Sequence, residues 1–143
     1  MPKYRQLHLK ILDSIDVQDM PDDFTRLSWV LLSLVVDGAG RGIDNPAWVR
    51  AKMYPLREDV TMAQIAAAMD WYTKRGMIGR YEADGRKYFY IVKWNTYQSG
   101  TEKEAKSVIP EPDLLRTYSG PTPRQYNTRA MQYKYNARAK RAG

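Results

Sequence analysis

The clearest periodic pattern of apolar and polar positions lies between residues 61 and 98. Apolar residues first recur at the spacing of one helical face, at Met62, Ile65, Met69 and Tyr72. Thr61 and Gln64 have the spacing of a capping box, in which each residue's side chain binds the other's backbone N–H. Gly76 follows Lys74 and Arg75, as expected where a helix ends. The pattern predicts a helix over residues 61–75.

After Gly76 the period changes from helical to alternating. The segments Ile78–Ala83 and Arg86–Val92 are rich in aromatic and basic residues, and they flank Asp84-Gly85, a strong two-residue hairpin turn. A capped helix followed by a glycine and a basic, aromatic hairpin is the layout of a winged helix. We therefore predict an α+β fold, a winged helix-turn-helix with a C-terminal two-stranded wing.

The segment from Asp23 to Val36 is predicted to be a helix that is apolar around much of its circumference. One stripe contains Phe24, Leu27, Leu31 and Leu34, and a second contains Trp29, Leu32 and Val36. Such a helix is expected to be buried on two sides. It is either a central core helix, or its second stripe is covered by the N-terminal arm or by a twin subunit. Tyr4–Leu12 alternates and is interpreted as a short strand or an extended arm.

Asp37–Gly42 is glycine-rich but lacks the Gly-Lys-Ser/Thr of a phosphate-binding loop, so we interpret it as a turn. Asn45-Pro46 has the residues of a helix start, with Pro at the first helical position. This helix is predicted to end at Tyr54, before Pro55. Together with the helix over residues 61–75 it would form a helix-turn-helix with an enlarged turn.

The charge of +7 and the pI of about 9.6 favour an anionic partner, nucleic acid first. From Gly120 onward there are six basic residues and no acidic one, which leaves 17 basic and 16 acidic residues before it. We predict a winged-helix domain over residues 1–98, a linker over 99–123, and a basic, flexible tail over 124–143 that stays disordered until it meets a partner.

The residues that usually carry chemistry are scarce. The chain has no cysteine and one histidine, His8, and no zinc-site spacing or nucleophile–base pair is visible. We expect no enzyme activity, no cofactor and no metal. The sequence contains no run of about 18 apolar residues, so no membrane span is predicted. The N-terminus lacks an apolar signal region, so a cytoplasmic location is expected.

The region from about Asp37 to Gln98 resembles the winged-helix domain of small phage and prophage proteins related to replication initiators (replisome organisers). The matching segments are Asp37-Gly38 with Gly40-Arg41-Gly42, Asn45-Pro46, Ala51–Pro55, Val60-Thr61, Gly76-Met77-Ile78, Arg80–Tyr88, and Trp94 with Tyr97-Gln98. The resemblance implies a DNA-binding protein of the bacterial host cytoplasm that acts in phage DNA replication as an initiator or an accessory factor.

The predicted nucleic-acid interface has three parts. If Ile65, Met69 and Tyr72 face the core, the helix turns another face outward, and in a winged helix that face would enter the major groove. The candidates are Gln64, Ala67, Trp71 and Lys74 on this helix, Arg80, Arg86 and Lys87 on the wing, and Arg124, Arg129, Lys134, Arg138, Lys140 and Arg141 in the tail. Trp71 can instead pack under the wing.

Two other functions use the same fold. A transcriptional regulator would need a homodimer to read a two-fold site. A protein-interaction adaptor, acting in replication or transcription, would dock its partner through the Trp29 stripe or Trp71. The few charges on the presumed reading helix favour the adaptor, whereas the basic wing and tail favour phosphate binding with weak base readout.

Overall fold

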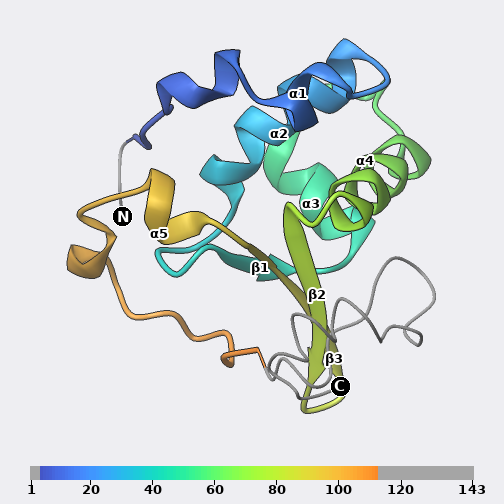
Figure 1. Cartoon of the computed structure of the whole chain (residues 1–143). Coiled ribbons are helices and arrows are strands. Elements are labelled where there is room, and N and C mark those ends of the chain that lie inside the picture. The colour runs from blue at the N-terminus through green and yellow to red at the C-terminus, as the bar shows by residue number, and fades with distance from the viewer. Residues whose placement is uncertain (1–3, 113–143) are drawn as a thin grey trace.

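The computed structural model describes residues 4–112 of the chain. Within this range the fold is α+β, with five α-helices, two short 3-10 helices and a three-stranded antiparallel sheet (Figure 1). The helices are α1 (Ile15–Gln18), α2 (Asp23–Val35), α3 (Pro46–Met53), α4 (Met62–Lys74) and α5 (Trp94–Tyr97). The strands are β1 (Arg41–Ile43), β2 (Ile78–Ala83) and β3 (Arg86–Ile91), and the 3-10 helices are η1 (Leu9–Leu12) and η2 (Thr101–Lys103).

The sheet has the strand order β1-β3-β2, and all its pairs are antiparallel. Strands β2 and β3 form the predicted hairpin, with Ala83 paired to Arg86 across the turn. Asp84 and Gly85 have φ angles of 54° and 77°, the left-handed values that a hairpin turn of the primed type requires. The order helix, strand, helix, helix and hairpin from α2 to β3 is compatible with a winged-helix-like arrangement.

Local caps place α3 and α4 as the sequence predicts. The capping box of α4 is complete, since Gln64 N donates to Thr61 Oγ1 at 3.1 Å and Thr61 N donates to Gln64 Oε1 at 2.9 Å. Gly76, with φ 75°, follows the end of α4. At the start of α3, Asn45 Oδ1 accepts from the backbone N–H of Ala47 at 2.8 Å.

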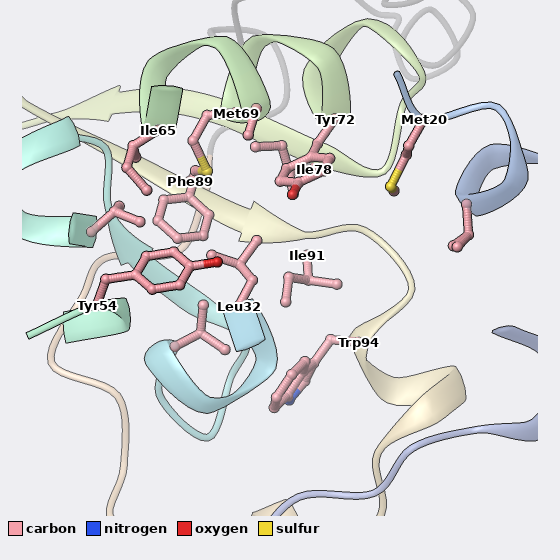
Figure 2. Packing of buried hydrophobic residues seen from close by; sticks show 14 of the residues in the cluster. Met20, Leu32, Tyr54, Ile65, Met69, Tyr72, Ile78, Phe89, Ile91 and Trp94 are labelled. Carbon is pink, nitrogen blue, oxygen red and sulfur yellow. The ribbon is translucent and has the colours of Figure 1, made fainter. Parts of the chain in front are cut away.

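The core lies between the helices and one face of the sheet, where Leu32, Ile65, Tyr72 and Phe89 are fully buried (Figure 2). Two buried tyrosine hydroxyls are hydrogen-bonded, and that of Tyr54 shares a 2.8 Å hydrogen bond with Ser28 Oγ. Tyr72 donates to the carbonyl oxygen of Thr25 at 2.6 Å, which satisfies a group that would otherwise destabilise the core. Burial raises the pKa of the Tyr72 hydroxyl well above its usual range, so this side chain stays neutral.

The second stripe of α2 faces the core of its own domain. Leu32 and Val36 are buried, and the Trp29 ring lies 5.1 Å from that of Tyr72. Leu32 and Val36 are thus covered by the helix's own domain, as in a central core helix, whereas Trp29 also faces a cavity that Ile11 of the arm lines. This stripe needs no twin subunit to cover it. The first stripe instead turns partly outward, because Leu27 and Leu34 are 46% and 59% exposed.

Of the two structures predicted for Tyr4–Leu12, a short strand or an extended arm, the strand does not form and residues 4–8 form an arm. Residues 4–8 have no regular structure and run into η1, and both Leu9 and Leu12 are exposed. The side chain of Gln98, and not the edge of a strand, holds the arm through the backbone of Gln6. Gln6 N donates to Gln98 Oε1 at 3.1 Å, and Gln98 Nε2 donates to Gln6 O at 2.7 Å. Alternation of apolar and polar residues alone does not distinguish a strand from an arm that side-chain hydrogen bonds hold.

Residues 104–112 form a segment, here called the strap, that runs back from η2 towards the β2–β3 hairpin (Figure 1). Its contacts begin with an ion pair between Arg5 and Glu104, which are both nearly buried. Further along, Arg41 Nη1 donates to Ile109 O at 2.7 Å, and Tyr81 Oη donates to Pro110 O at 2.8 Å. This part of the predicted linker is thus packed on the domain, while the domain boundary at residue 98 stays a prediction.

Candidate nucleic-acid interface

The face of α4 that the sequence predicts to turn outward does so. Ala63, Gln64, Ala67 and Lys74 are exposed, and Ile65, Met69 and Tyr72 point into the core. The exposed positions in the first half of the helix are uncharged, and Lys74 stands in its last turn. A helix with this face can contact thymine methyl groups, but it offers little to phosphate.

Gln64 is partly committed to the fold. Its Oε1 accepts the backbone N–H of Thr61 at 2.9 Å and lies 3.3 Å from Thr61 Oγ1. Reading adenine with a glutamine uses both the amide oxygen and the amide nitrogen. To bind adenine in this way, Gln64 would have to give up half of the capping box.

Trp71 is half-buried and packs under an arginine, not under the wing. The Arg75 guanidinium lies 4.9 Å from the centre of the Trp71 ring, a cation–π contact. Arg75 is in turn held by Asp19 at 3.0 Å and Asp16 at 3.1 Å, and these bonds raise its pKa. Trp71 therefore joins α4 to the region of α1, which differs from the predicted alternative of packing under the wing.

Arg80 is buried and paired, so the structure gives no support to the prediction that it contacts nucleic acid. Its side chain is 6% exposed; Nη1 donates to Asp70 Oδ1 at 2.7 Å, and Nε lies 3.3 Å from Asp44 Oδ2. The Nε–H does not point at this oxygen and has no directed hydrogen bond. Successive side chains of a strand point to opposite faces, so residues 78, 80 and 82 share one face of β2. At position 80 this face is turned towards α4, which is why a basic strand residue is buried in the domain. We leave Arg80 out of the proposed interface.

The wing tip is exposed and carries equal numbers of positive and negative charges. Lys87 pairs with Glu82 in register across the hairpin, Arg86 pairs with Ala83, and Asp84 occupies the turn. Arg86 and Lys87 remain at the surface, where they can reach phosphate. Because two acids lie beside them, the wing alone is a weak anion site.

The described residues as a whole are electrically neutral. Residues 4–112 contain 15 basic and 15 acidic side chains, a net charge of 15 − 15 = 0. The formal charge of +7 therefore comes entirely from residues outside this range. Electrostatic attraction of a polyanion depends on those residues far more than on the packed domain.

The strap ends against the outer face of the wing. The hydroxyl of Tyr81, a β2 residue, binds Pro110 O, and the chain leaves the described range two residues later. Tyr81 is buried and packs against Tyr88 and Tyr90, with ring centres 5.6 Å and 6.0 Å away. Burial raises the pKa of Tyr81 to about 12, so its hydroxyl stays a hydrogen-bond donor at neutral pH.

No local signal in the sequence predicts the strap, because Ser, Pro and charged residues over 99–112 are typical of a linker. The six predicted tail residues, Arg124, Arg129, Lys134, Arg138, Lys140 and Arg141, lie outside the described residues. Residues 4–112 contain no helix long and apolar enough to cross a membrane, and no group of three side chains placed to hold a metal ion.

A comparison with models of protein families, with curated proteins and with solved structures finds no match to this chain.

Proposed function

We propose that this chain is a winged-helix DNA-binding protein that takes most of its affinity from phosphate contacts made by the wing and the basic tail. Support for the fold comes from the order α2, β1, α3, α4, β2, β3 and the strand order β1-β3-β2. In a winged helix, α4 would lie in the major groove and the β2–β3 hairpin beside it. The face of α4 supports weak base readout at most.

The path of the strap carries the proposal. Tyr81 and Arg41 hold Pro110 and Ile109 on the sheet, so the described chain ends beside the wing, twelve residues before the predicted tail begins. On this proposal, Arg86 and Lys87 of the wing and the tail cations bind neighbouring stretches of one nucleic-acid backbone.

The biological role follows from the resemblance to phage and prophage replication proteins. We propose an initiator or accessory role in phage DNA replication, in the cytoplasm of the bacterial host. A protein with weak base readout suits a step at which another factor, or DNA structure, selects the site. A transcriptional regulator is the alternative, and it would form a homodimer in sedimentation velocity.

The test compares the full chain with a chain cut after Ser119, by fluorescence anisotropy on random duplex and random single strands over a range of salt. Each lost phosphate contact lowers the salt slope by about 0.9 on duplex and about 0.7 on single strands. Loss of all six tail contacts would therefore lower the duplex slope by about 5. A full-length variant with the six tail cations changed to Gln is the matched control and should behave like the truncated chain.

The wing is tested separately with Arg86→Gln/Lys87→Gln. This pair should lower the duplex slope by about 2, whereas Lys52→Gln/Lys103→Gln, which makes the same charge change on α3 and η2, should leave the slope almost unchanged. Should the truncated chain and the wing variant both keep the affinity and slope of the full chain, the DNA-binding proposal is wrong.

One observation favours an adaptor as the second candidate. The exposed first half of α4 is uncharged and small, with Ala63 and Ala67 beside Gln64, a surface that suits another protein as well as a base edge. Ala67→Glu separates the two functions. If α4 enters a groove, the new carboxylate weakens DNA binding by roughly tenfold through phosphate repulsion. If α4 docks a protein, DNA binding is unaffected.

A further inference from the structure

A cavity of about 390 Å³ lies between the N-terminal arm and the body of the domain, at the opposite end of the sheet from the wing turn. Its wall is mainly apolar and aromatic. The residues that define it are Ile11, Val17, Trp29, Met77, Val92 and Trp94, drawn from η1, α1, α2, the ends of β2 and β3, and α5. Concave apolar sites of this size are typical of small-molecule binding.

The walls of the cavity are fixed by hydrogen bonds on both sides. On one side, the arm is tied to the body by the paired bonds between Gln6 and Gln98. On the other side, Arg26 Nε donates to Val17 O at 3.0 Å and holds α1 against α2. Gln6, Leu7 and Ile11 of the arm line the space between these ties. The cavity is therefore a feature of how the arm is anchored.

The charges that line the cavity are unequal. Lys10, Arg75 and Lys93 contribute three positive charges and Asp16 contributes one negative charge, a net of 3 − 1 = +2. The Asp16 carboxylate is held by Arg75 at 2.9 Å. Within residues 4–112, neither lysine takes part in an ion pair: Lys10 projects from η1, and Lys93 from the start of α5. Two lysines without an ion pair among these residues thus line a cavity whose wall is mainly apolar.

We propose that this cavity binds a small amphipathic carboxylate, with its apolar body against Trp29 and Trp94 and its carboxylate at the two lysines. The apolar wall supplies most of the affinity, and the lysines supply the preference for an anion. The ligand would bridge the arm and the body, so binding should also raise the melting temperature of the chain. This site is independent of the wing and tail.

Octanoate is the test ligand, and octanol, which has the same apolar chain without the charge, is its matched control. Calorimetric titration of the full chain measures both affinities. Lys10→Gln/Lys93→Gln should weaken octanoate binding about tenfold and leave octanol binding within about twofold. Lys52→Gln/Lys103→Gln removes the same charge away from the cavity and should change neither affinity.

Two further readouts locate the ligand. Ser33 also lines the cavity, and Ser33→Met should fill it and weaken both ligands at least tenfold while the far-ultraviolet spectrum is kept. The four indole N–H resonances provide an internal control, since Trp29 and Trp94 line the cavity whereas Trp48 and Trp71 do not. Octanoate should shift only the first pair. No saturable binding, shifts in all four indoles, or unchanged octanoate affinity in the lysine variant would overturn the proposal.

Discussion

Arg80→Met distinguishes a structural from a DNA-binding role of the buried arginine. Methionine keeps much of the apolar stem of arginine and removes the guanidinium. Asp70, whose side chain is 32% exposed, can regain water, but the Asp44 side chain is only 11% exposed and loses the positive charge that lies 3.3 Å away. Removing one partner of a buried pair costs about 3–5 kcal/mol, and we expect about 3 kcal/mol because Asp70 is partly solvated.

A loss of about 3 kcal/mol lowers the melting temperature by about 12 °C, at roughly 4 °C per kcal/mol for a chain of this size. Circular dichroism during heating and urea titration measures the effect. Arg80→Met/Asp44→Leu, which replaces both buried charges with apolar groups, should recover about 1–2 kcal/mol of the stability lost in Arg80→Met. Duplex affinity measured at 25 °C should be unchanged. A variant with normal stability and weakened DNA binding would show that Arg80 reaches phosphate after all.

Three other predictions concern the caps and the strap. Thr61→Ala should cost about 1 kcal/mol in urea unfolding, because α4 loses its cap; an unchanged midpoint would contradict this. Tyr81→Phe removes the bond to Pro110 and should increase proteolysis within residues 104–112 without changing the melting temperature of the domain by more than about 5 °C. The side-chain hydrogen bond from Thr25 holds the pKa of Asp22 below its ordinary value of 3.8. Its contribution to stability is therefore present above about pH 4 and lost as the pH falls below that value, and Asp22→Asn should lessen this loss in acid unfolding.

The parts of the fold that the sequence predicts correctly are those specified by neighbouring residues. The capping box of Thr61 and Gln64 is complete within four residues, and the turn at Asp84-Gly85 needs only its own left-handed backbone. Strand β1 was missed because three residues within a glycine-rich turn have no periodicity. It forms because Gly42 pairs with Phe89, a partner far along the chain.

The orientation of α2 shows a different limit. Both of its stripes are apolar, so periodicity alone does not say which stripe faces the core. The polar residues decide it: Ser28 shares a 2.8 Å hydrogen bond with the hydroxyl of Tyr54, and the carbonyl oxygen of Thr25 accepts one from Tyr72. These bonds turn Leu32 inward and leave Leu27 partly outside. A serine within an apolar helix was the available signal, and its partner lies 26 positions away.

The candidate site was harder to predict because a basic residue's role depends on what lies beside it. Of the eight arginines within residues 4–112, seven hold the fold: Arg5, Arg26, Arg57, Arg75 and Arg80 bind carboxylates, and Arg41 and Arg50 bind backbone carbonyl oxygens. Only Arg86, at the wing, has no such bond among these residues. Arginine suits this structural role because its planar guanidinium group donates hydrogen bonds to several acceptors at once. The charge left to attract a polyanion, as the proposed function requires, therefore lies on the wing, on surface lysines and outside residues 4–112.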